Sequence, residues 1–141
     1  MAEEMSAAAA YAAAAGLAFD DSAVEGGVPL ISLTFFNQLG EPFYAAVDCT
    51  DYPKFPPTIE FTDDRGALRG DKRFYPNCFH PTPCVCARYC RKAYSERGGP
   101  HGDWRLVDWH LPTGNGIRID TLALIISDLH SKIAVSTGRL G

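Results

Sequence analysis

The sequence lacks any long apolar run, and it contains no lysine or arginine before Lys54. A membrane-spanning helix needs about 18 or more consecutive apolar residues, so no membrane span is predicted. A secretory signal peptide begins with basic residues, whereas the alanine-rich start of this chain carries Glu3 and Glu4 and no positive charge. These absences exclude the usual signal peptide and favour a cytoplasmic protein with no membrane partner.

Charge is unevenly distributed along the chain, although the formal net charge is only −4. Eight of the 17 acidic residues precede Lys54, whereas all 13 basic residues lie at or after it. Residues 65–105 hold nine basic and three acidic side chains. A nucleic-acid-binding domain usually has a basic footprint, and this chain is acidic overall. We therefore expect a solvated loop surface at 65–105 and no nucleic-acid partner.

Alternating apolar residues and turn signals predict an antiparallel meander of about three to four strands. Strands are expected at residues 30–38, 43–49 and 58–62, with a short turn between the first two. The prolines of YPKFPP lead into the third strand, because they cannot lie inside a sheet. Cys49, at the end of the second strand, is expected in the core.

Two helices are predicted, one at each end of the chain. The alanine content predicts a helix that stops at Gly16, followed by an acidic, glycine-containing linker at residues 20–27. The C-terminal helix is expected behind an N-cap at Asp120, with an end at Gly138. Its apolar face is defined by residues at helical spacing: Leu122, Ile125, Ile126, Leu129 and Ile133.

The length of 141 residues fits a single domain of the α+β class. Residues 1–27 are interpreted as the N-terminal helix and its linker, and residues 28–141 as the domain proper. The region after the third strand is predicted to be irregular, because prolines at 76, 81 and 83 rule out a continuous helix. Trp104 and Trp109 are expected to be buried anchors, at least one of them beneath this loop.

Three of the five cysteines lie in the stretch FHPTPCVCARYC, which runs from Phe79 to Cys90. In a reducing compartment disulfides are rare, so clustered cysteines indicate metal binding or catalysis. The usual Cys-x-x-Cys spacing of zinc sites is absent, although the soft ligands are numerous enough for tetrahedral zinc. They are Cys78, His80, Cys84, Cys86 and Cys90.

A catalytic thiol is the alternative to zinc. The nucleophile is the thiolate, and a free cysteine with a pKa of about 8.5 is only slightly ionised near neutral pH. The basic residues Arg88, Arg91 and Lys92 would favour the anion if their charged groups came within about 4–6 Å of the sulfur. His80 could serve as a base or as a donor to a developing oxyanion. A loop histidine bonded to the backbone is the structural alternative.

The order of these features resembles the ubiquitin-conjugating enzyme family. The similarity covers about residues 28–136, and two local motifs carry it. The segment YPKFPPTIEF, from Tyr52, is similar to the family's double-proline entry into a strand. The pair His80-Pro81 lies upstream of Cys86, as in the family. The divergence is similar to that of bacterial members, which act beside ubiquitin-like proteins and activating enzymes, some of them in antiphage defence.

The chain departs from the family pattern at the triplet that precedes the catalytic cysteine. The family has His-Pro-Asn, whose asparagine is thought to stabilise the oxyanion, whereas this chain has a threonine at position 82. The family's spacing from the triplet points to Cys90, while the apolar context of Val85 and Ala87 favours Cys86. We favour Cys86, with Cys90 and then Cys84 as alternatives. Asn77, in a separate Tyr-Pro-Asn triplet, is a candidate to supply the missing amide.

The resemblance implies a ubiquitin-conjugating-type fold and an acyl transfer that needs no cofactor. Cys86 would accept a ubiquitin-like protein from an activating enzyme as a thioester and pass it to a lysine of a target protein, with His80 and Asn77 in supporting roles. The alternative is a non-catalytic interaction module with the same fold, with or without zinc. The family's first helix is basic and receives the activating enzyme, whereas this one carries Glu3 and Glu4. An activating partner with a basic groove would suit it.

Overall fold

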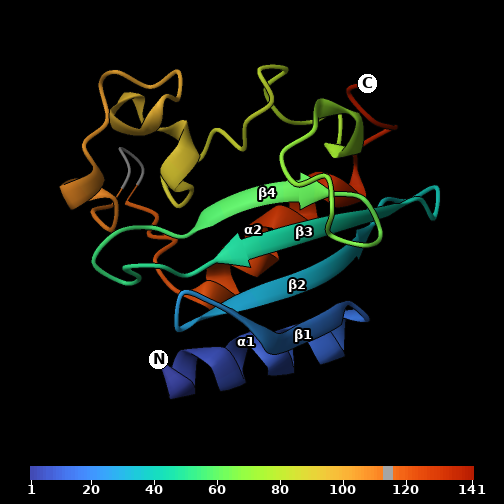
Figure 1. Cartoon of the computed structure of the whole chain (residues 1–141), viewed down its shortest axis with the longest axis horizontal. Helices are drawn as coiled ribbons and strands as arrows, with labels where there is room; N and C mark the ends of the chain where they lie inside the picture. The colour runs from blue at the N-terminus through green and yellow to red at the C-terminus, as the bar shows by residue number, and fades with distance from the viewer. Residues whose placement is uncertain (113–115) are drawn as a thin grey trace.

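Four antiparallel strands form a sheet at the centre of the molecule, in the order in which they occur along the chain (Figure 1). The computed structural model describes residues 1–112 and 116–141. Helix α1 (Ala2–Ala15) precedes the strands and helix α2 (Leu122–Ala134) follows the loop region. The strands are β1 (Ala18–Glu25), β2 (Val28–Phe36), β3 (Pro42–Asp48) and β4 (Thr58–Thr62). The α+β class is confirmed.

The register of the sheet aligns the apolar side chains of three strands on one face. Ile31 of β2 pairs with Val47 of β3, and Val47 pairs with Ile59 of β4; all three are at most 2% exposed. The same alternation buries Leu33 and Phe35, because side chains two residues apart lie on the same face of a strand. The three predicted strands are therefore confirmed to within two residues at each end.

The acidic linker predicted at residues 20–27 is wrong. Strand β1 occupies most of this segment and pairs with β2 from Ala18↔Thr34 to Glu25↔Val28, with an irregularity between Asp20 and Ala23. Nearly all of its side chains are exposed, so no apolar alternation marks it as a strand. The turn at Gly26 and Gly27, both with positive φ, was the available signal for a hairpin. Because β1 belongs to the sheet, residues 1–27 are part of the same unit as the rest.

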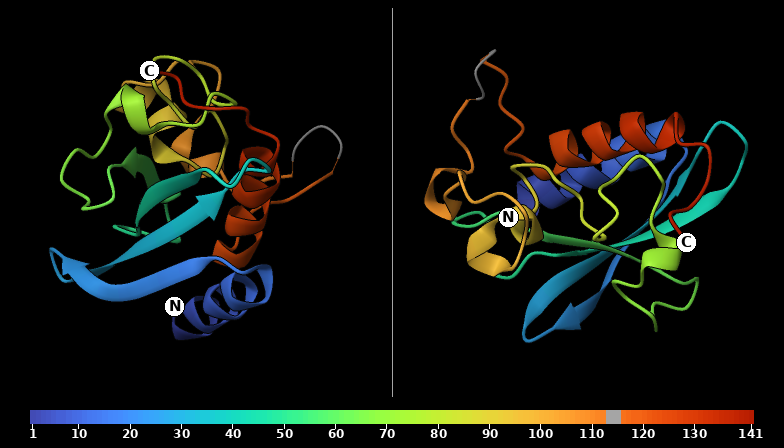
Figure 2. Two further views of the ribbon diagram at one scale, coloured as in Figure 1. Left: turned by 90° about the vertical axis from the view of Figure 1, so that its right-hand side faces the viewer. Right: turned by 90° about the horizontal axis from the view of Figure 1, so that it is seen from above.

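Helix α1 packs against α2 and against β1, on the sheet face that carries the core (Figure 2). Ala8 and Ala12 are fully buried in this contact, where small side chains allow the two helices to approach closely. The helix ends at Gly16, which adopts φ 74° as a left-handed cap. The stop predicted at this glycine is confirmed.

Helix α2 buries all five apolar residues that its sequence pattern predicts, each at most 2% exposed. Its ends differ from the prediction. Thr121, not Asp120, is the N-cap, since its side chain accepts a hydrogen bond from the backbone N–H of Leu124. Asp120 instead pairs with Arg118 at 2.8 Å. The helix ends at Ala134, with Val135 as the C-cap, and so stops before Gly138.

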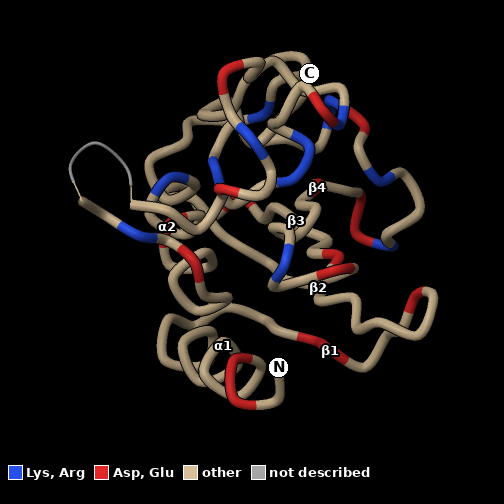
Figure 3. Tube along the Cα trace, turned by 90° about the vertical axis from the view of Figure 1, so that its left-hand side faces the viewer, with Lys and Arg blue, Asp and Glu red and all other residues tan. Residues whose placement is uncertain are grey.

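The irregular region between β4 and α2 lies beside the β4 edge of the sheet and contains short 3-10 helices: η1 (Lys72–Phe74), η2 (Arg91–Ala93), η3 (Ser95–Arg97) and η4 (Leu106–Asp108) (Figure 1). Its own aromatic residues extend the core, for example Tyr75, which meets Phe61 of β4 at 5.2 Å between ring centroids. Most of the basic residues lie in this region, whereas the charged residues of α1 and β1 are all acidic (Figure 3).

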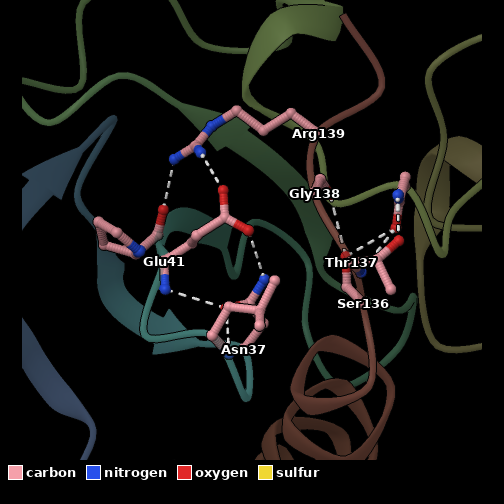
Figure 4. Close-up of polar contacts among 9 residues, drawn as sticks. Asn37, Glu41, Ser136, Thr137, Gly138 and Arg139 are labelled. Atoms are coloured by element: carbon pink, nitrogen blue, oxygen red, sulfur yellow. Dashed lines mark hydrogen bonds and ion pairs between the residues drawn. The ribbon is translucent and has the colours of Figure 1, made fainter.

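The chain after α2 returns to the sheet and is held by a polar network (Figure 4). Arg139 donates to the Pro42 carbonyl at 2.6 Å and lies 3.5 Å from Glu41, whose other carboxylate oxygen accepts from Asn37 at 2.8 Å. The backbone N–H of Leu140 donates to the Tyr75 carbonyl at 2.9 Å. This C-terminal anchor joins the end of the chain to the loop that leads into the cysteine cluster.

Candidate functional site

The cysteine loop begins with a tight hairpin between His80 and Cys84. The two residues exchange backbone hydrogen bonds of 3.1 and 3.0 Å, and they enclose Pro81, Thr82 and a cis-bonded Pro83. After the hairpin, the loop is attached to β4 and to the residue before it. The Cys90 sulfur donates to the Ile59 carbonyl, and the backbone N–H of Arg91 donates to the Pro57 carbonyl at 2.9 Å. These contacts fix the position of the intervening residues 85–89.

Three of the five cysteines are buried. Cys49, as predicted, is in the core, and burial raises its pKa from 9.0 to about 11. Cys90 is completely buried, its sulfur donates to the Ile59 carbonyl at 3.7 Å, and burial raises its pKa to about 11 as well. Burial, together with the neighbouring Cys90 and Cys86, also raises the pKa of Cys84. These thiols stay protonated and lack access, which makes Cys90 and Cys84 poor nucleophiles.

Cys86 is partly exposed and lies between two cavities. The larger, of about 240 Å³, is mainly apolar, and Trp104 and Trp109 form part of its wall. The smaller, of about 120 Å³, is also bordered by His80 and Cys78. Of the described cysteines, Cys86 is the one that borders both cavities.

Helix α2 contributes a charged pair to the larger cavity. The Lys132 ammonium lies 2.6 Å from the Asp128 carboxylate, and the Tyr89 hydroxyl donates to the same carboxylate oxygen at 2.6 Å. Burial and this hydrogen bond raise the pKa of Tyr89, so it remains a donor at neutral pH. Lys132 also borders the smaller cavity. An ammonium and a carboxylate therefore lie on the wall of a site that contains a thiol.

The three basic residues near the cysteines in sequence have different positions in space. Arg88 borders the larger cavity, with its guanidinium 4.8 Å from the centroid of the Trp104 ring. Arg91 instead donates to the Pro56 carbonyl at 3.0 Å, and Lys92 pairs with Glu60 at 2.7 Å. Of these three residues, only Arg88 lines the same cavity as Cys86.

The two tryptophans form part of the wall of the larger cavity. Trp109 is 3% exposed and donates from its indole nitrogen to the Pro53 carbonyl at 3.1 Å, so the predicted buried anchor is confirmed. Trp104 is partly exposed and stacks on His101, with centroids 3.6 Å apart and the rings nearly parallel. His101, to which no role could be given from the sequence, supports the Trp104 wall of the cavity.

His80 is exposed at the rim of the smaller cavity. Its Nδ1 atom accepts a hydrogen bond from the backbone N–H of Thr82 at 3.3 Å and lies 3.0 Å from the Thr82 hydroxyl. A backbone N–H can only donate, so in the neutral ring the proton is on Nε2. In this tautomer His80 presents an N–H donor at Nε2, which suits stabilisation of negative charge better than proton abstraction.

Asn77 belongs to the C-terminal anchor. Its Nδ2 donates to the Thr137 hydroxyl at 2.9 Å, and its Oδ1 accepts from the Ser136 hydroxyl at 2.8 Å. Asn77 borders neither cavity of Cys86. The structure therefore brings Cys86 and His80 together, and it gives the Asn77 amide other partners.

A zinc site is not formed in the described part of the chain. Among residues 1–112 and 116–141, no three His, Cys, Asp or Glu side chains are grouped so that they could hold a metal ion. The sulfur of Cys90 is directed at a backbone carbonyl of β4, and the buried Cys84 thiol has Cys86 as its hydrogen-bond partner.

Sequence reasoning missed the contribution of α2. Asp128 and Lys132 are four residues apart, a spacing that places them on one face of a helix, and Tyr89 follows the cysteines closely. These were the available signals. Nothing in the sequence shows that this face of α2 lies against the cysteine loop, because the contact joins residues about 40 positions apart.

Comparison of the chain with protein-family models, curated proteins and solved structures finds no match. In the described residues, no helix has both the length and the apolar character that crossing a membrane would require.

Proposed function

We propose that this protein is an acyl-carrier enzyme of the ubiquitin-conjugating type, with Cys86 as the residue that carries the thioester. The element order supports this proposal: an N-terminal helix, an antiparallel meander, an irregular loop with the cysteine, and a C-terminal helix. The same order underlies the resemblance of the sequence to that family. The finer fold assignment is part of the proposal.

One observation carries it: Cys86 is an accessible thiol between two cavities of different character. The His80 rim of the smaller cavity offers an N–H donor, while the larger cavity offers apolar walls and the Asp128–Lys132 pair. Acyl transfer between two carriers needs room on both sides of the sulfur, one side for the acyl chain and one for the attacking amine. The two cavities supply that room.

The chemistry has two steps. The Cys86 thiolate attacks the carbonyl carbon of the incoming thioester, and the tetrahedral intermediate expels the thiolate of the activating enzyme. An uncharged amine of the target lysine then attacks the new thioester, releases the Cys86 thiolate and loses a proton to solvent or to a nearby carboxylate. Negative charge develops on the carbonyl oxygen in both steps, where the Nε2–H of His80 is the candidate donor.

The partners are an activating enzyme, a ubiquitin-like protein and a target protein with an accessible lysine. No cofactor enters either step. Of the two acidic residues proposed to meet a basic groove on the activating enzyme, Glu3 is exposed, but Glu4 accepts hydrogen bonds within the protein from Tyr52 and from the backbone N–H of Leu122. Glu3 is therefore the residue whose charge reversal tests docking.

The placement of Asn77 favours a second candidate, a non-catalytic interaction module with this fold. In that case the missing amide at the site reflects a lost activity, and the cavities would bind a partner without forming a covalent bond. The two candidates differ in whether Cys86 is ever acylated.

The deciding experiment incubates the protein with ATP and with the activating enzyme and ubiquitin-like protein encoded beside it. We expect an adduct that a thiol reductant removes. Cys86→Ala should abolish the adduct, whereas the exposed-thiol control Cys78→Ser and the buried-thiol control Cys90→Ala should retain it. An adduct that survives Cys86→Ala and disappears in Cys90→Ala would move the assignment to Cys90. Absence of an adduct in every variant would support the binding module.

A further inference from the structure

The larger cavity beside Cys86 offers a bound group mainly contacts with carbon atoms. Its wall includes the rings of Trp104 and Trp109 and the aliphatic side chain of Ile119. The indole N–H of Trp109 donates to the Pro53 carbonyl at 3.1 Å, so this donor is already occupied. The aromatic and aliphatic part of the wall therefore attracts apolar groups, which gain free energy when they leave water.

The polar side chains of the same wall are engaged with one another. The Tyr89 hydroxyl and the Lys132 ammonium both bind the Asp128 carboxylate, each at 2.6 Å. Among the described residues of the wall, Arg88 is the remaining charged side chain, and its guanidinium lies 4.8 Å from the centroid of the Trp104 ring. A basic group would meet this cation, and a neutral polar group would leave water for a mainly apolar surface. The wall therefore favours an apolar group.

The size and position of the cavity limit what that group is. A closed apolar cavity of about 150 Å³ holds benzene, so a volume of about 240 Å³ has room for a phenyl ring or a branched aliphatic side chain. Cys86 itself borders the cavity. A group that enters it while the acyl carbon is bonded to the Cys86 sulfur must be attached close to that carbon.

We infer that the acyl group delivered to Cys86 carries a large apolar side chain next to its reacting end, and that the larger cavity binds this side chain. The inference rests on the proposed function and names the substrate class for it: a polypeptide whose C-terminal residues include a bulky apolar one close to the carboxyl group. In the transfer, the Cys86 thiolate forms a new C–S bond, the C–S bond to the donor breaks, and the departing thiolate takes up a proton.

Small thioesters test this without an activating enzyme. The full-length protein is treated with acetylated dipeptide thioesters that end in glycine and differ in the preceding residue, which is phenylalanine, leucine, serine, aspartate or arginine. Mass spectrometry locates the acyl group and follows its rate of attachment. We expect the phenylalanine and leucine thioesters to acylate Cys86 about tenfold faster than the serine thioester, and the arginine thioester to be the slowest. Cys78 is exposed and does not border the larger cavity, so its acylation should show no such order.

Two variants of the wall locate the preference. Trp104→Ala and Ile119→Ala each remove apolar surface from the cavity, and each should reduce the ratio of the leucine rate to the serine rate to about threefold or less. Neither side chain is fully buried, which favours folding of both variants. Val107→Ala is the matched control, because Val107 is an exposed apolar residue nearby in the chain that does not border the cavity, and it should keep the ratio of the parent protein.

The outcomes separate this inference from the proposed function. Acylation of Cys86 at equal rates by all five thioesters would overturn the inference and leave Cys86 as the acyl carrier, and so would a faster reaction of the serine, aspartate or arginine thioester. A ratio that stays unchanged in both wall variants would also overturn it. Absence of acylation at Cys86 with every thioester would overturn it too, and the adduct assay with the activating enzyme would then judge the proposed function separately.

Discussion

The side chain of Asn77 uses both ends of its carboxamide to hold the segment that follows α2. Ser136, which donates to it, is 2% exposed, so loss of the acceptor would leave a buried hydroxyl with only the Gly138 carbonyl as partner. Because these hydrogen bonds occupy the Asn77 carboxamide, Asn77 has a structural role in this conformation. Its contribution should therefore be visible in stability and absent from acyl transfer.

Replacing Asn77 with alanine should lower the free energy of unfolding by about 1–3 kcal/mol, because several hydrogen bonds are lost and Ser136 is left partly unpaired. Urea unfolding followed by circular dichroism measures this. Asn77→Asp keeps the acceptor oxygen and loses the donor, so its free energy of unfolding should lie between those of Asn77→Ala and the parent protein. Transfer to lysine per folded molecule should be unchanged. Slower transfer from a normally formed adduct, with unchanged stability, would return Asn77 to the site.

The choice among the cysteines shows what sequence context can and cannot decide. The spacing of the family motif points to Cys90, and the apolar context points to Cys86. The structure buries Cys90 against β4 and leaves Cys86 on two cavities. Burial of a given thiol depends on how the loop packs on a strand about 30 residues earlier in the chain, and no local pattern contains that information.

At the level of elements, apolar periodicity predicted the helix and the strands that bury one face. Helix α2 and strands β2, β3 and β4 each bury one face, so their patterns are strong. Strand β1 buries almost nothing, and its pairing depends on backbone hydrogen bonds that leave no trace in side-chain polarity. The N-cap was predicted one residue too early, at Asp120, because Thr121 is also a residue type that caps helices.

The docking of α1 on the rest of the molecule depends on Glu4. Its carboxylate accepts from the Tyr52 hydroxyl and, at 3.0 Å, from the backbone N–H of Leu122 at the start of α2. The carboxylate thus joins one helix to the first turn of another, where an unpaired N–H and the helix dipole favour negative charge. A single side chain connects α1, α2 and the proline-rich segment before β4.

We expect Glu4→Ala to lower the free energy of unfolding by about 1–3 kcal/mol, since two donors lose their acceptor. Glu3→Ala is the matched control: it removes the same charge from an exposed position one residue away and should change stability by less than about 0.5 kcal/mol. Thermal or urea unfolding of both variants measures these losses of stability. Equal effects would mean that the contribution comes from the charge of the helix N-terminus alone.

For the molecule as a whole, the candidate site is assembled from three separate segments. The cysteine loop supplies Cys86 and Tyr89, the turn before η4 supplies Trp104, and α2 supplies Asp128 and Lys132. The sequence could predict each segment but not their contact, because nothing local brings the polar face of α2 to the loop. The same assembly buries thiols at distant places in the chain, among them Cys49 just after β3 and Cys90 in the loop.

These two buried thiols should make the protein lose stability in alkaline solution. Each pKa rises on folding from 9.0 to about 11, so above pH 9 the unfolded chain releases protons that the folded chain retains. Their contribution is fully present below pH 9 and is lost between pH 9 and 11, by up to about 2–3 kcal/mol for each thiol. Urea unfolding at a series of pH values measures the slope, to which the buried Cys84 and, at the upper end, buried tyrosines also contribute. Cys90→Ala should have a lower free energy of unfolding at pH 7, and this free energy should decline less steeply as the pH rises. The exposed control Cys78→Ser should keep the slope of the parent protein. Parallel curves for Cys90→Ala and the parent protein would mean that Cys90 ionises as readily in the folded chain as in the unfolded one, and its exclusion as a nucleophile would then lose its main support.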